Sequence, residues 1–271
     1  IFAVDDLVMV EMATNSTKEI RRVSAIETSP AHQITLSQPL SQTPGVGDLI
    51  ATGEIWTPAD YDHQTYTLLH LTDDRLVEFR RAVLSLKAAA AVSEKLNFSF
   101  EFDAASMDST NAQNGWLLQA FAYGDGTPKM DGSQITKKPP VYTTGAVNHF
   151  GSTELHVASF EFDLGHARSE HRYINNHHFT ITERASSLQI QFKDASVIPK
   201  NTWEASGTTA DLLLAVGRER GNTVAFYING QIQEGATNEN NNEFNDWSAT
   251  FAHVDDQTDA NQAKRPKIVR F

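Results

Sequence analysis

Four histidines that lie close together in the second half of the chain are the residues most suggestive of chemistry. They are His166, His171, His177 and His178. Zinc bound by histidine needs two or three imidazoles that converge, most recognisably from positions i and i+4 of one helix. The spacing here is irregular, and the intervening residues favour strands and turns. We therefore expect these histidines on a surface or in a loop, where pH sensing at a subunit contact is the one role left open.

Paired carboxylates are a second candidate for chemistry. They occur at Asp5-Asp6, Asp73-Asp74 and Asp255-Asp256. Glycoside hydrolysis needs two carboxylates that face each other across a substrate, whereas neighbouring residues of a strand point to opposite faces. The spacing of an EF-hand calcium loop is absent as well. We interpret all three pairs as acids of turns and strand ends.

The remaining motifs also favour structure over catalysis. The segment from Gly217 to Gly221 lacks the lysine of a phosphate-binding loop and is predicted to be a hairpin turn. No serine stands in the GxSxG pattern of a nucleophile elbow. Four tryptophans could form a sugar-binding platform, but the apolar residues around most of them favour core or interface anchors: Trp56, Trp116, Trp203 and Trp247. The sequence predicts no catalytic residue, no metal and no cofactor.

Composition narrows the class of protein further. With 271 residues, 40% hydrophobic and 21% charged, the chain can form one large globular domain or two of ordinary size. It has no cysteine, which excludes disulfides and thiolate chemistry. No apolar run approaches the roughly 20 residues that span a bilayer. The net charge of −12 opposes nonspecific binding to nucleic acid. Because the chain begins with Ile1, we expect residues to precede it.

The elements that must position these side chains are predicted to be strands. Short alternating runs separated by proline and glycine turns indicate a small barrel or Greek-key sheet in residues 1–55, with strands near residues 7–10, 20–26, 33–36 and 48–51. Strands are also predicted at residues 65–71 and 96–103. The stretch 73–92 contains four consecutive alanines, but the alternation of Val77, Phe79 and Val83 favours two strands and a turn over a helix.

The second half repeats this pattern. Strands are predicted at residues 155–162, 178–181, 188–192, 212–216, 224–228 and 247–251. Strand, turn, strand, excursion and closing strand therefore occur in residues 65–103 and again in residues 211–256. The excursion 235–243 is rich in asparagine, and we expect a mobile loop or a segment that orders against another copy. The basic tail 264–271 is expected to be solvated or to complement an acidic surface of another copy.

Several of these stretches resemble the major tail proteins, or tail tube proteins, of long-tailed bacteriophages. Residues 6–10, 22–26, 34–40 and 47–50 look like the small barrel-like insertion of such proteins. Residues 56–71 and 96–102, the latter ending in Phe-Ser-Phe-Glu-Phe, look like their strand and closing strand. The second tube-like unit is matched by residues 160–165, 181–184 and 208–256. The family has no catalytic residues to transfer.

The resemblance implies a mainly β fold with two tube-like β-sandwich or barrel units, a small barrel-like N-terminal insertion and few short helices. We predict a small β-barrel-like segment at residues 1–55 and a first tube-like unit at 56–123, incomplete on its N-terminal side. A linker at 124–150, which contains Pro139-Pro140, and a second unit with the basic tail at 151–271 complete the chain.

The function implied by the resemblance is structural. The chain would be a virion tail tube subunit, assembled in the host cytoplasm, that forms trimers of pseudo-sixfold symmetry or hexamers. Stacked rings would conduct double-stranded DNA without binding it specifically and would contact the tape measure, tail-tip and terminator proteins, with no membrane partner. A tail-tip or terminator ring, a carbohydrate-binding β-sandwich and, more remotely, a sugar hydrolase are the alternatives.

Overall fold

The fold is built from antiparallel β-strands. The computed structural model describes residues 2–13, 18–29, 33–57, 65–71, 75–111, 148–174, 176–192, 209–217, 222–241, 244–254 and 265–271. These ranges contain nineteen strands and no helix. The predicted mainly β class is therefore confirmed, while the few short helices of the prediction have no counterpart in the described ranges.

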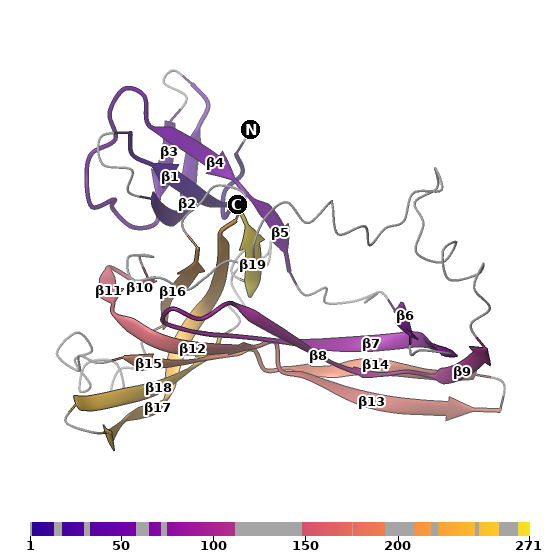
Figure 1. The fold of residues 1–271 in the computed structure, drawn as a ribbon. Helices are drawn as coiled ribbons and strands as arrows, with labels where there is room; N and C mark the ends of the chain where they lie inside the picture. The colour runs from indigo at the N-terminus through magenta and orange to yellow at the C-terminus, as the bar shows by residue number, and fades with distance from the viewer. Residues whose placement is uncertain are drawn as a thin grey trace.

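A small sheet forms the N-terminal part of the fold and lies at the top of Figure 1. Its strands run in the order β3-β2-β1-β4, with bounds β1 (Leu7–Glu11), β2 (Lys18–Glu27), β3 (Gln33–Leu36) and β4 (Leu49–Thr52). Leu7, Met9 and Ile20 are buried against Leu213 and Tyr227 of the main sheet. These residues form a second hydrophobic core, which lies between the small sheet and one face of the main sheet.

The main sheet has 13 strands and folds over on itself to form a sandwich. Nine strands follow one another in the order β11-β10-β16-β17-β18-β15-β12-β7-β6. Strands β8 and β9 also pair with β7. Strand β19 pairs with β17 on one side and with β5 on the other. The bounds are β5 (Glu54–Trp56), β6 (Tyr66–Leu71), β7 (Arg75–Ala91), β8 (Asn97–Asp103), β9 (Ser106–Asn111), β10 (Asn148–Phe150), β11 (Thr153–Leu155), β12 (Val157–Asp163), β15 (Ser187–Phe192), β16 (Thr209–Val216), β17 (Val224–Asn241), β18 (Phe244–His253) and β19 (Lys267–Arg270).

Alternation of side chains decides which face of each strand enters the core. Phe160 and Phe162 of β12 are buried while Glu161 between them is exposed. Phe226 of β17 lies opposite, with its ring centroid 5.3 Å from those of both phenylalanines. The predicted alternation of residues 188–192 is confirmed, because Leu188, Ile190 and Phe192 are buried while Gln189 and Gln191 face solvent.

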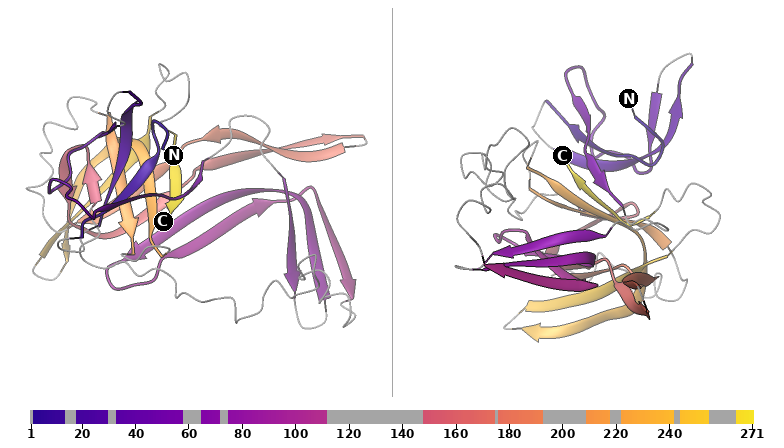
Figure 2. Two further views of the ribbon diagram at one scale, coloured as in Figure 1. Left: turned by 90° about the horizontal axis from the view of Figure 1, so that it is seen from above. Right: turned by 90° about the vertical axis from the view of Figure 1, so that its right-hand side faces the viewer.

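Strand β7 carries the sheet beyond the sandwich. Its second half pairs with β12 on one side and β8 on the other, and its first half pairs with β6 and β9. The hairpin of β13 (His166–Tyr173) and β14 (Asn176–Arg184) extends in the same direction, as Figures 1 and 2 show. We call this extension, made of β6, β9, the first half of β7 and the β13–β14 hairpin, the arm.

Residues 73–92 do not form the predicted two strands and turn. Residues 75–91 are one strand of 17 residues, in which Arg81 adopts a left-handed conformation with φ of 54°. The register against β6 also shifts here, between Tyr66 and Leu68. Pairing on both sides of β7 holds the chain extended, so the irregularity is a kink rather than a reversal.

Three further predictions need correction. The predicted strand 155–162 is divided at His156 into β11 and β12, because these strands pair with different partners. Residues 235–241 of the excursion are not a loop, since β17 continues to Asn241 with bulges and stays paired to β18, and residues 242–243 lie outside the described residues. The tail is not a solvated end, since residues 267–270 form β19 between β17 and β5.

The proposed division of the chain remains a prediction. Strands from the predicted first and second units lie in one sheet and meet where β7 pairs with β12. The predicted linker at residues 124–150 lies almost entirely outside the described residues, as does the segment up to 123 that would end the first unit.

Replacing Phe226 should show how strongly the sandwich depends on its aromatic core. Phe226→Ala removes a fully buried ring and should lower the free energy of unfolding by roughly 3–5 kcal/mol. Phe100→Ala is the matched control, because Phe100 is 60% exposed and its loss should change that free energy by less than about 1 kcal/mol. Denaturant titration at a dilution where the chain is monomeric measures both. Equal losses would contradict the assignment of the core.

Candidate assembly surface

The four histidines, expected on a surface or in a loop, lie in the strands β13 and β14 and are half-buried. His171 and His178 are direct partners across the arm hairpin, with ring centroids 5.2 Å apart. His171 Nε2 lies 2.9 Å from Thr180 Oγ1, and His177 Nε2 lies 2.7 Å from Glu170 Oε1 on the other face. His166 Nδ1 contacts the Leu84 carbonyl oxygen at 3.2 Å. No group of three or more metal-binding side chains occurs among the described residues.

The other candidate residues are dispersed. Asp6 accepts a hydrogen bond from the Ala3 amide at 2.7 Å, as a turn acid does, whereas Asp5 binds Arg22. Asp73-Asp74 and Asp255-Asp256 lie outside the described residues, as do Trp116 and Trp203. Gly217, with φ of 93°, follows the last residue of β16 and is the first residue of the predicted hairpin turn, whose residues 218–221 lie outside the described residues. Trp56 is 46% exposed at the end of β5, and Trp247 lies in β18.

An ionic cluster joins the small sheet to the main sheet. Arg22 of β2 contacts Asp5 at 2.5 Å and Asp211 of β16 at 2.9 Å. The Tyr227 hydroxyl donates to Asp211 at 2.8 Å, and Lys267 Nζ donates to the Asp5 carbonyl oxygen at 2.7 Å. Burial raises the pKa of Tyr227 and lowers the pKa of Lys267. We call these five residues the junction.

The junction is not predicted from the sequence, which indicates an acid of a turn at Asp5 and a basic tail at Lys267. The sequence contains one signal for the junction, which is the charged residue Asp211 directly before the apolar run Leu212-Leu213-Leu214. Charged residues are seldom buried without a partner, so such positions indicate that one comes from elsewhere in the fold.

A second buried ion pair lies next to the junction. Glu19 and Arg21 are almost completely buried, 2.5 Å apart, and Arg21 also donates to the carbonyl oxygens of Ile20 and Pro39. Ser41 donates its amide and its hydroxyl to Glu19. His149 of β10 is close by, and burial together with the positive charge of Arg21 lowers its pKa to about 4.

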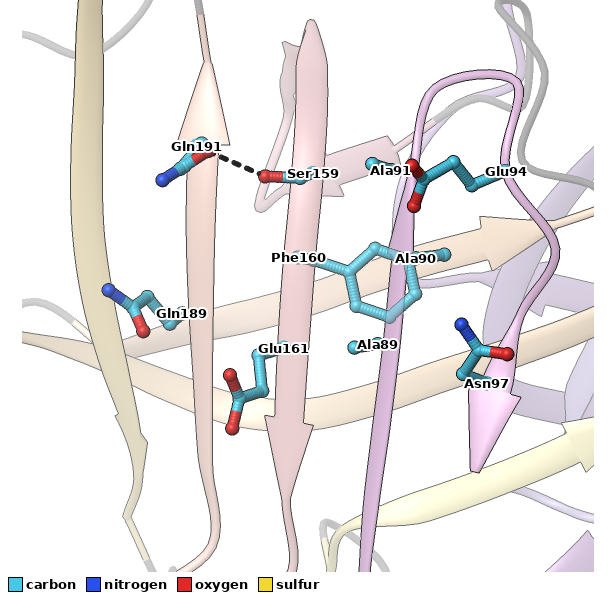
Figure 3. A pocket seen from close by; sticks show the side chains of 10 residues that line it. All are labelled: Ala89, Ala90, Ala91, Glu94, Asn97, Ser159, Phe160, Glu161, Gln189 and Gln191. Carbon is cyan, nitrogen blue, oxygen red and sulfur yellow. Dashed lines mark hydrogen bonds between the residues drawn. The ribbon is translucent and has the colours of Figure 1, made fainter. Parts of the chain in front are cut away.

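The central sheet presents a polar face to solvent. A shallow depression of about 260 Å³ lies over β7, β12 and β15 (Figure 3). Its lining combines small, amide and acidic side chains: Ala89, Ala90, Ala91, Glu94, Asn97, Ser159, Phe160, Glu161, Gln189 and Gln191. Ser159 donates to Gln191 at 2.8 Å. Among the described residues, those that line the depression include two acids, Glu94 and Glu161, and no cation, and Lys87 beside it is paired with Asp163 at 3.0 Å.

The arm hairpin covers this same side of the sheet further along β7. Val83 and Ser85 are 1% and 6% exposed there. Arg168 of β13 holds Asp103 at 2.8 Å and Glu101 at 3.7 Å, both on β8. The hairpin is thereby fastened to the polar side of β8.

The opposite side of β8 is apolar and largely exposed. Phe98, Phe100 and Phe102 are 43%, 60% and 37% exposed. They alternate with polar residues and lie beside Ala88, Leu86 and Leu84 of β7, on the face that forms the core of the sandwich. Among the described strands β8 pairs with β7 alone, so it is a sheet edge. We call the three rings the phenylalanine stripe.

Removing the central acid of the junction should weaken the attachment of the small sheet. Asp211→Ala leaves Arg22 and Tyr227 without their shared acceptor and should lower the free energy of unfolding by roughly 2–4 kcal/mol. Glu78→Gln breaks the exposed pair with Arg80 and should leave that free energy nearly unchanged. Chemical denaturation of both variants makes the comparison, and equal effects would contradict the role of the junction.

Stability should fall as the solution becomes acidic because of His149. Above its ordinary pKa of 6.5 the ring is neutral in folded and unfolded chains alike. Between pH 6.5 and about 4 the unfolded chain binds a proton that the folded chain does not, so the free energy of unfolding decreases as pH falls. His149→Gln should reduce this slope. Burial also lowers the pKa of His166, so some slope should remain. An unchanged slope in the variant would refute the assignment.

No protein-family model matches this chain, and a search of curated proteins finds no relative. Within the described residues, no helix is long and apolar enough to cross a membrane.

Proposed function

We propose that the chain is a virion structural protein, a tail tube subunit that assembles with copies of itself into stacked rings through which viral DNA passes. The phenylalanine stripe is the observation that carries this proposal. Three aromatic rings on a sheet edge leave apolar surface and backbone hydrogen-bonding groups exposed at the same place. A partner strand that pairs with this edge would bury the apolar surface and would satisfy the backbone hydrogen-bonding groups.

The polar face of the central sheet supports the same function. Its depression is wide, shallow and free of cations, and the chain as a whole carries a net charge of −12. A wall of alanine, amide and carboxylate groups repels phosphate and offers DNA no base-specific contacts. Such a face is suited to the lumen of a conduit.

The arm supports contact between rings. It extends the sheet well past the sandwich (Figures 1 and 2), and Tyr173 and Ile174 near the end of its hairpin are 65% and 101% exposed. An extended hairpin with apolar residues near its end can reach a neighbouring ring while the sandwich stays within its own. A tail-tip or terminator ring would use the same surfaces in a single ring.

Negative-stain electron microscopy of the purified protein at rising concentration tests this proposal. We expect rings with a central channel and, at higher concentration, stacks of rings. Single rings that never stack would favour the tip or terminator function. A monomer at every concentration would refute self-assembly, and a glycan-binding screen would then test the carbohydrate-binding alternative.

A further inference from the structure

Strand β8 has a sequence that is complementary to itself. It reads Asn-Phe-Ser-Phe-Glu-Phe-Asp from Asn97 to Asp103, and Phe100 is its central residue. When a second β8 pairs antiparallel with Phe100 opposite Phe100, Phe98 lies opposite Phe102. Residues that lie opposite each other in such a pair point to the same face, so all six rings gather on the apolar side. The free edge of β8 therefore supplies its own apolar partner.

The same register matches the polar residues on the other face. Ser99 lies opposite Glu101 of the second copy, and Asn97 lies opposite Asp103 of the second copy. In both pairs a side chain with a hydroxyl or amide donor meets a carboxylate, which accepts hydrogen bonds. No carboxylate of β8 is placed directly opposite another carboxylate.

The charges around the pair are balanced. Arg168 holds Glu101 at 3.7 Å and Asp103 at 2.8 Å within each copy. Lys95 is exposed, whereas the next residue, Leu96, is buried in the core. Alternation therefore puts Lys95 on the polar side, diagonal to Asp103 of the second copy. The one like-charge diagonal joins the two Glu101 side chains, and both Arg168 side chains oppose it. Two acids and two bases in each copy leave no net repulsion.

The rings of the phenylalanine stripe are already held in place for this contact. Phe98 contacts Phe226 of β17, with ring centroids 6.4 Å apart, and Phe102 contacts Phe79 of β7 at 5.0 Å. Phe100 between them is the most exposed of the three, at 60%, and lies on the twofold axis of the pair. Side chains that are held before binding lose less conformational entropy when the contact forms.

The amount of apolar surface predicts a weak dimer. A phenylalanine buries about 150–250 Å² when fully covered, so the exposed parts of the stripe amount to roughly 200–350 Å² in each copy. Two stripes supply roughly 400–700 Å², whereas stable complexes bury at least about 1,200 Å² in total. Backbone hydrogen bonds between the two edges add to the contact. The pair should therefore dissociate on dilution and leave the edge available to another strand.

We infer that two free subunits pair through their β8 strands, antiparallel and centred on Phe100, into a symmetric dimer. The sheet of one copy then continues into the sheet of the other, and neither β8 edge is left open to unrelated strands. This dimer goes beyond the proposed function, because it concerns the subunit before it joins a ring. One edge accepts one strand at a time, so the dimer dissociates when the ring contact forms.

Single cysteines test the register of the pair. The chain has no cysteine, so each variant carries one thiol. Ser99→Cys and Glu101→Cys, mixed in equal amounts and mildly oxidised, should form a disulfide between unlike chains, because directly opposite Cα atoms lie about 4.5–5.5 Å apart. Each variant alone should stay unlinked, since the same residue of the two copies lies on a diagonal of about 7–8 Å. Non-reducing electrophoresis and mass spectrometry identify the product.

Removing the central ring tests what holds the pair together. Phe100→Thr keeps a strand-forming residue and should weaken dimerisation at least about tenfold, since apolar surface is lost from both copies. Met107→Thr is the matched control and should leave dimerisation nearly unchanged, because Met107 is 68% exposed on β9 and lies outside β8. Sedimentation equilibrium measures the dimerisation constants, and far-UV circular dichroism verifies folding. The cysteine test keeps all three rings, so it decides the question if Phe100→Thr misfolds.

The outcomes separate this inference from the proposed function. A disulfide between unlike chains, with each variant alone unlinked, establishes the pairing. No disulfide in the mixture, equal linking of each variant alone, or a dimer that Phe100→Thr leaves unchanged overturns it. Rings that form from a wild type with no dimer would refute this inference and leave the tube function standing. A dimer that never converts into rings would keep this inference and refute the tube function.

Discussion

The structure depends on the uninterrupted pairing of strand β7. This strand pairs with β12 and β8 along one half and with β6 and β9 along the other, whereas the β13–β14 hairpin of the arm forms a two-stranded sheet of its own. Each face of β7 is covered along only part of its length. The second sandwich layer covers Ala88 and Ala90, and the arm hairpin covers Val83 and Ser85 on the opposite side. Each face therefore leaves one surface exposed. One is the polar depression over β7, β12 and β15, and the other is the apolar phenylalanine stripe on β8.

These two surfaces differ because alternation along a strand sends successive side chains to opposite faces. On the polar side, Glu161, Gln189 and Gln191 are exposed, and no described strand covers them. On the apolar side, Phe100 and Phe102 continue the core face beyond the point where β17 covers it. The strands β7 and β8 thereby carry a polar surface on one side and an exposed apolar surface on the other.

The junction plays a different part, since it fixes how the small sheet sits on the main one. Hydrophobic contacts between Leu7, Met9 and Tyr227 hold the two sheets together. They do not fix the relative orientation of the sheets, because hydrophobic contacts are non-directional. Arg22 adds direction, because its guanidinium reaches Asp5 and Asp211 at defined angles from two separate elements. The small sheet is thereby held against the main sheet in one orientation.

The sequence by itself determined the class of the fold and most of its strands. The alternation of Leu188, Ile190 and Phe192 with glutamines predicted a half-covered sheet, because burial of one face leaves a period of two in the residues. The sequence could not reveal that residues 75–91 form one kinked strand or that residues 267–270 form a strand paired on both sides, since both depend on partners distant in the chain. The same holds for the junction, whose acids and bases come from residues 5, 22, 211 and 267. Tertiary structure alone decided which apolar residues remain uncovered, because Phe100 and Phe162 have the same local pattern and differ only in whether another layer lies above them.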